Sequence, residues 1–389
     1  MSSQHQVDGH TLTLLRNGEE YFPRLIAAIE GASHTVYLET YIYATDESGN
    51  GVALALRRAA ARGVRVHLLL DGFGCAELPL AWVEEMRRAG VEVLRFRPEI
   101  SWLTFRRTRL RRLHRKLAVV DGRIAFVGGI NIINDIPAGT DMSPRLDYAV
   151  EIHGEVVRHV NAVVRRLWVL VSWMSLRRRR RHVKLMHKYT HSAERKVAFL
   201  LRDNLRNRRS IEQAYLKAIE GSQHEIILAS AYFIPGKRMR DALRNAVQRG
   251  VRVRLLLQGR VEYHLPHYAA LALYDELLGS GVEIHEYHVS FLHAKAAVVD
   301  GRWTTVGSSN IDPFSLWLAR EANLVVQDAA FAQALRSSLL HEMEHAARPV
   351  AHADWRKQGM WTHLLARVSY YFVQILAGVV GYAPWRDDA

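Results

Sequence analysis

Residues 114–121 read HRKLAVVD, and residues 293–300 read HAKAAVVD. The chain therefore carries the pattern His-x-Lys-x-x-x-x-Asp twice, each time followed by Gly-Arg and then by a glycine-containing turn that ends in Asn. The spacing from His to Asn is identical in the two copies, from His114 to Asn131 and from His293 to Asn310. A single match arises by chance in roughly one chain in twenty of this length, taking each residue type at ~5%. Two matches in the same context point to a function.

The two motifs belong to a duplication that covers most of the chain. Residues 27–43 return as 217–233, and residues 62–72 return as 249–259, in the same order as the motifs. The repeat is about 190 residues long and occurs only twice, so it is a duplication and not a solenoid. We therefore expect two lobes of the same fold.

Each copy alternates predicted helices with short apolar strands. In the first copy, a helix over Tyr21–Glu30 leads to a strand over Thr35–Tyr43, and a helix at about 51–61 leads to a strand over Val64–Leu70. Such alternation predicts α/β layers around a central sheet. The second copy repeats the pattern, with strands near 225–233, 251–257, 282–287 and 294–299.

The chain divides into four predicted parts. An N-terminal lobe covers 1–181, a basic linker covers 182–195, a C-terminal lobe covers 196–348, and an apolar tail covers 349–389. The linker contains three histidines, but no carboxylate accompanies them, so we interpret it as a solvated linker and not as a metal site.

Composition restricts the partners and the compartment. The 389 residues carry a formal net charge of +14, so nucleic acid, an anionic membrane surface or phosphorylated substrates are all candidate partners. The one cysteine, Cys75, excludes an internal disulfide and a cysteine-based metal site. The polar start of the chain has no apolar segment typical of a secretion signal, which favours the cytoplasmic side.

The residue types of the motif suit phosphoryl chemistry. An imidazole can attack phosphorus or exchange protons near neutral pH. Lysine and asparagine donate to phosphate oxygens, and glycines let backbone N–H groups approach an anion. In an extended segment His114 and Lys116 share one strand face, and so do His293 and Lys295. A nucleophile and a separate acid need two histidines, which two halves facing across a pseudo-twofold axis would supply.

Each histidine also needs an acidic partner to fix its tautomer. Asp147 lies downstream of His114, and Glu321 lies downstream of His293, in equivalent places of the two copies. We take these acids as the candidate partners. The aspartates that close the two motifs are either part of the catalytic set or anchors of their own turns.

The doubled motif with its trailing Gly-Gly or Gly-Ser and Asn turn resembles the signature of the phospholipase D superfamily. Within it, the stretches 114–132 and 293–326 are similar to the bacterial cardiolipin synthases in their shorter form. The resemblance spans about 12–350. It implies two tandem αβα sandwich lobes with mixed central sheets, related by pseudo-twofold symmetry, and one active site at the lobe interface. It also implies a two-step mechanism through a phosphatidyl-histidine, without a metal or other cofactor.

The resemblance carries roles onto individual residues. It implies that His114 is the nucleophile and His293 the general acid and then the general base, although the near symmetry of the copies leaves this order open. The remaining assignments are catalytic positions at Lys116, Asp121, Lys295 and Asp300, phosphate-binding positions at Asn131, Asn310, Gly129 and Ser308, and supporting acids at Asp147 and Glu321.

Two apolar segments are candidates for membrane contact. A helix near 159–176 carries an apolar stripe and is followed by five arginines at 177–181. It can lie in the membrane interface or pack on its own lobe. The stretch from Val368 to Pro384 carries no charged residue, which suits an interfacial helix, a helix covering one lobe, or a contact between copies.

Three functions compete at this stage. The first is phosphatidyl transfer from one phosphatidylglycerol to another or to a related alcohol, at the bacterial inner membrane, with phosphatidylethanolamine as a further substrate. The second is a phosphodiesterase of the same fold that hydrolyses phospholipid or nucleic acid. The third is a non-catalytic membrane scaffold. Nucleic acid is disfavoured because the aromatic residues lie in apolar runs and not among the basic residues. The intact second motif disfavours the scaffold, and the oligomeric state stays open.

Overall fold

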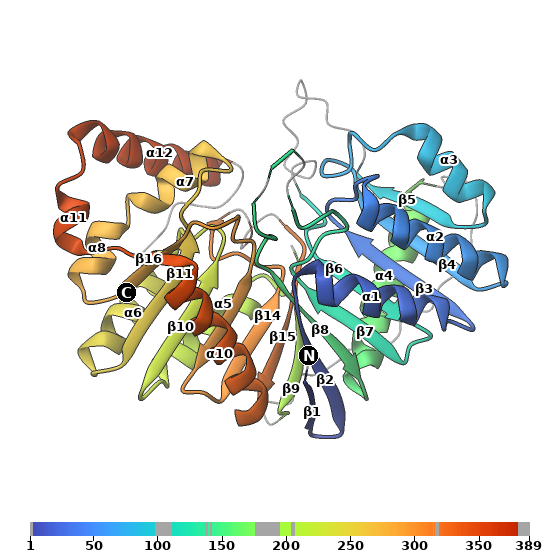
Figure 1. Cartoon of the computed structure of the whole chain (residues 1–389), viewed down its shortest axis with the longest axis horizontal. Coiled ribbons are helices and arrows are strands. Elements are labelled where there is room, and N and C mark those ends of the chain that lie inside the picture. The colour runs from blue at the N-terminus through green and yellow to red at the C-terminus, as the bar shows by residue number, and fades with distance from the viewer. Residues whose placement is uncertain are drawn as a thin grey trace.

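The computed structural model describes residues 3–97, 111–136, 139–140, 142–175, 195–203, 207–313, 315 and 319–379. The arginine run at 177–181, the linker up to residue 194 and the end of the tail at 380–389 lie outside the described residues. Two lobes lie side by side, one formed by each copy of the repeat (Figure 1).

The first lobe consists of strands and helices up to residue 175. Its elements are β1 (Gln4–Val7), β2 (His10–Arg16), α1 (Asn17–Glu30), β3 (Thr35–Thr40), α2 (Glu47–Ala61), β4 (Arg65–Asp71), α3 (Leu80–Arg88), β5 (Glu92–Phe96), β6 (Lys116–Val120), β7 (Ile124–Gly128), β8 (Tyr148–His153) and α4 (Val156–Ser175).

The second lobe repeats this order and adds helices at its end. Its elements are β9 (Val197–Arg202), α5 (Ser210–Glu220), β10 (Glu225–Ser230), α6 (Lys237–Gln248), β11 (Arg252–Gln258), α7 (His264–Leu271), α8 (Tyr274–Gly279), β12 (Glu283–Tyr287), β13 (Lys295–Val299), β14 (Trp303–Gly307), β15 (Glu321–Gln327), α10 (Ala329–His345), β16 (Ala347–Pro349), α11 (His352–Arg356) and α12 (Met360–Val379).

Seven strands of the two sheets share one order, and each sheet has one further strand at the opposite edge, β1 beside β2 and β16 beside β12. The first runs β1-β2-β8-β7-β6-β3-β4-β5, and the second, written in the equivalent direction, runs β9-β15-β14-β13-β10-β11-β12-β16. In both, three neighbouring strands are parallel and the rest are antiparallel, as the pairings of β3 with β4 and of β3 with β6 illustrate. The predicted pair of mixed central sheets is therefore confirmed.

Local sequence signals explain where the helices begin and end. The carboxylate of Asp46 accepts the backbone N–H of Gly49 at 2.9 Å and caps α2. Gly63 follows the end of α2 with a φ of +87°, a left-handed conformation that glycine adopts at little cost. Strand β4 follows directly, and six of its seven residues are buried because helices cover both faces of the sheet.

A shared hydrophobic core joins the lobes. One cluster of buried side chains contains Leu117 and Val150 of the first lobe together with Val298 and Leu324 of the second. Helix α4, which follows the first sheet, also contacts β9, and α10, which follows the second sheet, also contacts β2. The lobes are thus packed on one another, with their sheets meeting in the middle of the molecule (Figure 1).

Helix α4 corrects one of the membrane predictions. The apolar stripe expected to face lipid is buried against the lobe, with Val160, Val164 and Leu167 at most 3% exposed. The alternative, a helix packed on its own lobe, is what the structure shows. Only the last turns of α4 keep exposed apolar side chains, at Leu170, Trp173 and Met174.

The predicted tail is partly integrated into the second lobe. The predicted boundary between residues 348 and 349 falls inside β16, which pairs with β12. Helix α12 packs along α7 through buried Ala366, Val373 and Ala377. Across the described residues, no helix combines the length and the hydrophobicity that crossing a bilayer requires.

Candidate active site

The His-x-Lys segments enter the sheets at equivalent positions, at the starts of β6 and β13. Both lysines are buried, Lys116 at 3% and Lys295 at 1% exposure, and each ammonium group donates to the carbonyl of its own histidine, at 2.6 Å from Lys116 to His114. The expected placement of His and Lys side by side is confirmed. Each lysine side chain thereby ends at the backbone of the histidine that begins its motif.

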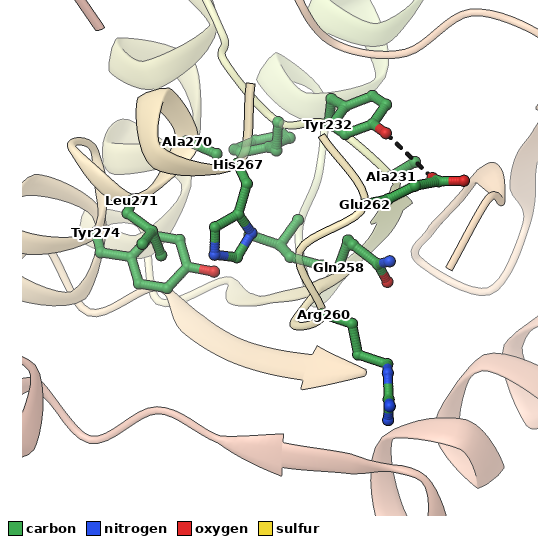
Figure 2. A pocket seen from close by; sticks show the side chains of 11 residues that line it. Ala231, Tyr232, Gln258, Arg260, Glu262, His267, Ala270, Leu271 and Tyr274 are labelled. Atoms are coloured by element: carbon green, nitrogen blue, oxygen red, sulfur yellow. Dashed lines mark hydrogen bonds between the residues drawn. The ribbon is translucent and has the colours of Figure 1, made fainter. Parts of the chain in front are cut away.

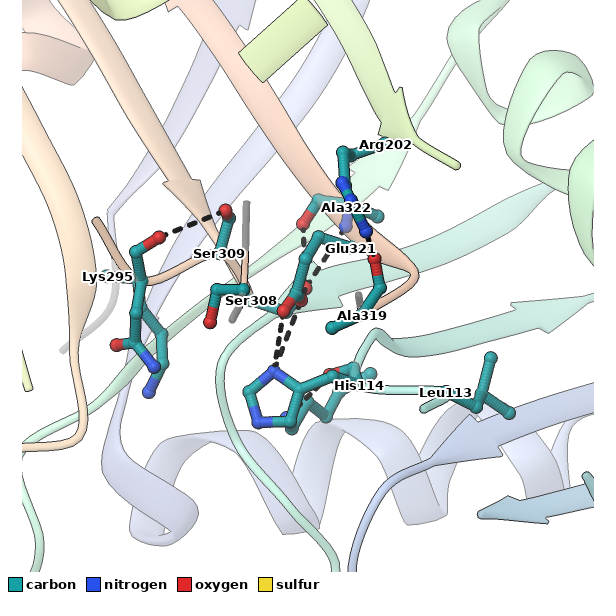
Figure 3. A network of polar contacts seen from close by, with 12 residues as sticks. Leu113, His114, Arg202, Lys295, Ser308, Ser309, Ala319, Glu321 and Ala322 are labelled. Carbon is teal, nitrogen blue, oxygen red and sulfur yellow. Dashed lines mark hydrogen bonds and ion pairs between the residues drawn. The ribbon is translucent and has the colours of Figure 1, made fainter. Parts of the chain in front are cut away.

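Each histidine is paired with an acid of the opposite lobe. Nδ1 of His114 lies 2.9 Å from Oε1 of Glu321, and Nδ1 of His293 lies 2.5 Å from Oδ2 of Asp147. Figure 3 shows the His114 ring turned toward the Glu321 carboxylate. The sequence places each acid downstream of the histidine of its own half, and the structure corrects this pairing.

Backbone contacts between the lobes explain the crossed pairing. The N–H of His114 donates to the carbonyl of Arg320 at 3.1 Å, one residue before Glu321. The N–H of His293 donates to the carbonyl of Leu146 at 2.8 Å, one residue before Asp147. Each of these backbone hydrogen bonds thus places a histidine next to the acid of the other lobe. The arrangement is the same at both histidines.

The pairing defines the state of the two imidazoles. A carboxylate accepts a hydrogen bond from a protonated Nδ1, and this tautomer leaves the Nε2 lone pair of each ring free for chemistry. Burial lowers the pKa of His114, and burial together with the charges of Lys295 and Lys116 lowers the pKa of His293 well below its ordinary value. Both rings are therefore neutral at pH 7 in the free enzyme.

The same burial changes the lysines and one acid. It lowers the pKa of Lys116 to about 7 and also lowers the pKa of Lys295. It raises the pKa of Asp147 to about 6. Desolvation disfavours every charged form here, so an anion that binds between the lysines restores their charge by attraction.

Gly129 and Ser308, expected at phosphate-binding positions, each lie next to one of the two acids. Gly129 lies next to Asp147, and Ser308 lies next to Glu321. The hydroxyl of Ser308 donates to Oε2 of Glu321 at 2.5 Å. A Cβ at position 129 would collide with the carboxylate of Asp147, so only glycine leaves room for that acid. The two lobes therefore hold their acids differently, because Glu321 accepts the hydroxyl of Ser308 and Asp147 accepts the backbone N–H of Tyr148 at 2.8 Å.

The two asparagines also differ. Oδ1 of Asn131 accepts the N–H of Ile42 at 3.1 Å, which fixes the loop after β3. Asn310 is 5% exposed, and its Oδ1 has no partner among the described residues. Its proposed contact to phosphate stays a prediction.

The structure does not bring Asp121 and Asp300 into this cluster. The carboxylate of Asp121 accepts the backbone N–H groups of Ser33, His34 and Thr35 at 2.7–2.8 Å. Asp300 repeats this contact with residues 223–225 at 2.8–2.9 Å. Both aspartates directly follow their strand, at the end away from the histidines. Each anchors the turn before the neighbouring strand, β3 or β10, whereas the alternative interpretation had each anchoring its own turn.

Sequence reasoning missed the residues that support the histidine segments from behind. Oδ2 of Asp71 accepts the N–H of Leu113 at 2.7 Å, and Oε1 of Gln258 accepts the N–H of Leu292 at 2.7 Å. A signal was present, because Asp71 and Gln258 occupy the same place in the repeat, each followed by glycine. Arg115, inside the first motif, forms a buried ion pair with Glu39.

A narrow recess lies in the second lobe (Figure 2). It follows the ends of β10 and β11, and Gln258 links it to the residue that precedes His293. It is lined by Ala231, Tyr232, Phe233, Leu257, Gln258, Arg260, Glu262, His267, Ala270, Leu271 and Tyr274.

Comparison with known proteins identifies the class. The family model described as "Cardiolipin synthase, PLD-like domain" matches residues 25–168 and 215–343, one match in each lobe. Together with the two crossed histidine–acid pairs, this defines a phosphatidyltransferase of the phospholipase D superfamily.

The chain belongs to the cardiolipin synthase family of that superfamily. It is 36% identical to cardiolipin synthase B of Salmonella typhi over 97% of this chain and 91% of that protein. It is 35% identical to cardiolipin synthase B of Escherichia coli K12 over the same shares. A cardiolipin synthase of Geobacillus thermodenitrificans is 32% identical over 94% of this chain and 72% of that protein.

Solved structures support the fold. A phosphatidylserine synthase of Haemophilus influenzae superposes with a TM-score of 0.69 at 14% identity and covers 94% of both chains. A polyphosphate kinase of Porphyromonas gingivalis superposes with a TM-score of 0.58 at 14% identity over 95% of this chain and 53% of that chain. At this identity the likeness concerns the fold alone.

Proposed function

We propose that the protein transfers a phosphatidyl group from one phosphatidylglycerol to a hydroxyl of another, or of a related alcohol, giving cardiolipin and glycerol. The observation that supports this most is the doubled, crossed pairing of a histidine with an acid, above two buried lysines. Such a site offers two imidazoles with free Nε2 atoms and two cations for one phosphodiester.

In the first step, Nε2 of His114 attacks the phosphorus of phosphatidylglycerol. A P–N bond forms, the P–O bond to the glycerol group breaks, and the departing oxygen takes a proton from the imidazolium of His293. Glycerol leaves, and the phosphatidyl group stays on His114. In the second step, His293 removes the proton from the hydroxyl of a second phosphatidylglycerol, the P–O bond to that oxygen forms, and the P–N bond breaks.

The protonation states fit this sequence once substrate is bound. His114 is neutral in the free enzyme, as a nucleophile requires, because burial lowers its pKa. His293 has to carry a proton for the first step, although burial and two lysines lower its pKa in the free enzyme. The phosphodiester anion opposes the charge of those lysines, so binding of the substrate favours the protonated form of His293.

The substrate is a bilayer lipid, so we place the enzyme on the cytoplasmic surface of a bacterial inner membrane. Helix α12 supports this placement, because its outward side carries exposed apolar residues, Trp361, Val368 and Tyr371 among them. The formal charge of +14 favours anionic lipid. Phosphatidylethanolamine is a second candidate among the lipid substrates.

The test is the product spectrum of the purified protein with phosphatidylglycerol vesicles, without added metal, followed by mass spectrometry of the lipids. We expect cardiolipin and free glycerol, and their absence for His114→Ala, because the P–N bond can no longer form.

Phosphatidic acid as the only product would replace the proposal with a hydrolase that uses the same site. No lipid product at all would overturn it, and a parallel reaction with single-stranded DNA would then test the phosphodiesterase. Full activity of His114→Ala would show that the roles are wrongly divided.

A further inference from the structure

The walls beside the two histidines are not equivalent. In the first lobe, the ring of Tyr41 packs edge-on against His114 with 4.8 Å between ring centroids, and it also lies 5.4 Å from Nζ of Lys116. The equivalent residue of the repeat is Ala231, which lines the recess of the second lobe. The second lobe thus has a recess at the position where the first lobe holds a tyrosine ring.

The recess contains an unused hydrogen-bond donor. Gln258 is 6% exposed, its Oε1 accepts the N–H of Leu292, and its Nε2 has no partner among the described residues. In the first lobe the equivalent Asp71 is fully engaged, since its second oxygen accepts the N–H groups of Phe73 and Gly74. A buried amide without a partner is costly, and it points to a group that fills the recess during function.

A fixed acceptor lies on the same wall. The carboxylate of Glu262 receives Nη1 of Arg145 from the other lobe at 2.8 Å and the hydroxyl of Tyr232 at 3.2 Å, a bond drawn in Figure 2. A carboxylate has about four acceptor positions, so it can accept another hydrogen bond. Its charge acts on the active site, because it raises the pKa of His293 against the lysines.

A donor and an acceptor on one narrow wall match the chemistry of a hydroxyl group, which both accepts and donates. The glycerol headgroup of phosphatidylglycerol has two hydroxyls on neighbouring carbons. When one of them reacts at phosphorus, the other lies one carbon further away, on the side where Gln258 joins the recess to the residue before His293.

We propose that the recess binds the non-reacting hydroxyl of a glycerol group, with Gln258 as donor and Glu262 as acceptor. This inference rests on the proposed function and adds the determinant of alcohol selectivity. It also places the alcohol on the side of His293. The histidine that handles the proton of the alcohol is then His293, and the phosphatidyl group is carried by His114.

The experiment compares two alcohols that attack the same phosphatidyl-enzyme. A short-chain phosphatidyl-p-nitrophenol serves as donor, with glycerol and ethanol present together, and the ratio of phosphatidylglycerol to phosphatidylethanol is measured by mass spectrometry. Ethanol has no second hydroxyl. In Gln258→Glu, the acceptor for Leu292 is kept and the free donor is lost. We expect the ratio to fall about tenfold.

Two further variants complete the design. Gln213→Glu makes the same change of charge at an exposed position of α5 and should leave the ratio unchanged. Ala231→Leu fills the recess and leaves Gln258 unmutated. It should reduce transfer to glycerol while transfer to ethanol continues. It also decides the matter if Gln258→Glu does not fold.

A ratio within twofold of the parent enzyme in both recess variants would overturn the inference. The ratio comes from a synthetic donor, so it does not depend on the natural lipid pair. An enzyme that makes no cardiolipin from phosphatidylglycerol vesicles, yet shows the expected fall in the ratio, would refute the proposed lipid acceptor and keep the recess as an alcohol site.

Discussion

At the scale of single residues, the same residue type has different tasks within one motif. The imidazole of His114 contacts Glu321 of the other lobe, and the ammonium group of Lys116 donates to the backbone carbonyl of His114. Asp121 lies just past the far end of the strand that Lys116 begins, and it binds the turn before β3. The first two residues of the motif therefore belong to the candidate site, and its aspartate stabilises the fold. The length of β6 separates the two ends of the motif.

Asp121→Asn tests this division of tasks. Burial raises the pKa of Asp121, but three backbone hydrogen bonds together lower it below its ordinary value. A depressed pKa means that the stabilisation is present above the unfolded pKa and is lost as the pH falls through the folded pKa. We expect the variant to lose about 1 kcal/mol of unfolding free energy at pH 7, measured by urea denaturation, since the site is partly exposed.

The difference in stability between the variant and the parent should shrink as the pH falls through the lowered pKa of the parent carboxylate. The turnover number of the folded variant should stay within a few-fold of the parent enzyme. A loss of turnover as large as that of His114→Ala, without a loss of stability, would return Asp121 to the catalytic set.

The sequence alone identified both histidines, both lysines and both acids, because the repeat presents each of them twice. It could not show that the acids cross over. That depends on the backbone bridges at Arg320 and Leu146, which join segments from different lobes. Spacing along one copy says nothing about which lobe a carboxylate faces. The recess was equally hidden, because its lining residues come from several segments of the second lobe that only the fold brings together.

At the scale of elements, α4 and α12 show how far periodicity can be interpreted. Both are 20-residue helices with abundant apolar residues. The stripe of α4 is buried between the first sheet and β9, whereas α12 buries only a line of small residues against α7 and leaves its large apolar residues outside. A pattern of apolar residues predicts that a face is covered, but not whether protein or lipid covers it.

Helix α12 is expected to bind the membrane surface. Its outward side carries Trp361, Leu364, Leu365, Val368, Tyr371, Phe372 and Ile375, each at least 45% exposed, and Arg367 is the only charged residue within the helix. Basic Arg356 and Lys357 precede it. An apolar face beside cations matches an anionic bilayer, with aromatic rings at headgroup depth.

The corresponding test replaces Leu364, Val368 and Phe372 by Gln and measures sedimentation with phosphatidylglycerol vesicles. We expect bound protein to fall at least about tenfold, while p-nitrophenol release from a soluble short-chain donor is unchanged. The matched control replaces the exposed Leu170, Trp173 and Met174 of α4 by Gln. If the α12 variant sediments like the parent, or if it loses self-association in solution instead, then α12 contacts a second copy of the chain and not lipid.

At the scale of the whole molecule, the duplication explains why the site needs both lobes. Equivalent strand orders place the two His-x-Lys segments at equivalent sheet positions, and the shared core presses these positions together. The general architecture could be predicted from the repeat, since two copies of one α/β unit with half a site each have to face one another. The additional edge strands β1 and β16 and the helices after β16 break the symmetry, and nothing in the repeat predicted them.

The crossed acids lead to a prediction about which lobe controls which step. If His114 carries the phosphatidyl group, then Glu321 of the second lobe orients the nucleophile of the first, and Asp147 of the first lobe orients the acid–base residue of the second. With a p-nitrophenol donor, the leaving group departs without a proton, so the first step needs only the nucleophile. Glu321→Gln should therefore slow the first release of p-nitrophenol at least about 100-fold, because the tautomer and charge behind His114 are lost.

Asp147→Asn is the matched variant, since it removes the same charge from the other pair. It should keep the first release of p-nitrophenol and lose turnover with phosphatidylglycerol, whose alkoxide leaving group does need a proton from His293. Rapid-mixing measurements of p-nitrophenol absorbance separate the two steps in both variants. The reverse pattern, with Asp147→Asn losing the first release and Glu321→Gln keeping it, would make His293 the nucleophile. The recess would then lie on the side of the histidine that carries the phosphatidyl group. This single pair of variants therefore decides which of the two histidines is the nucleophile and which is the acid–base residue.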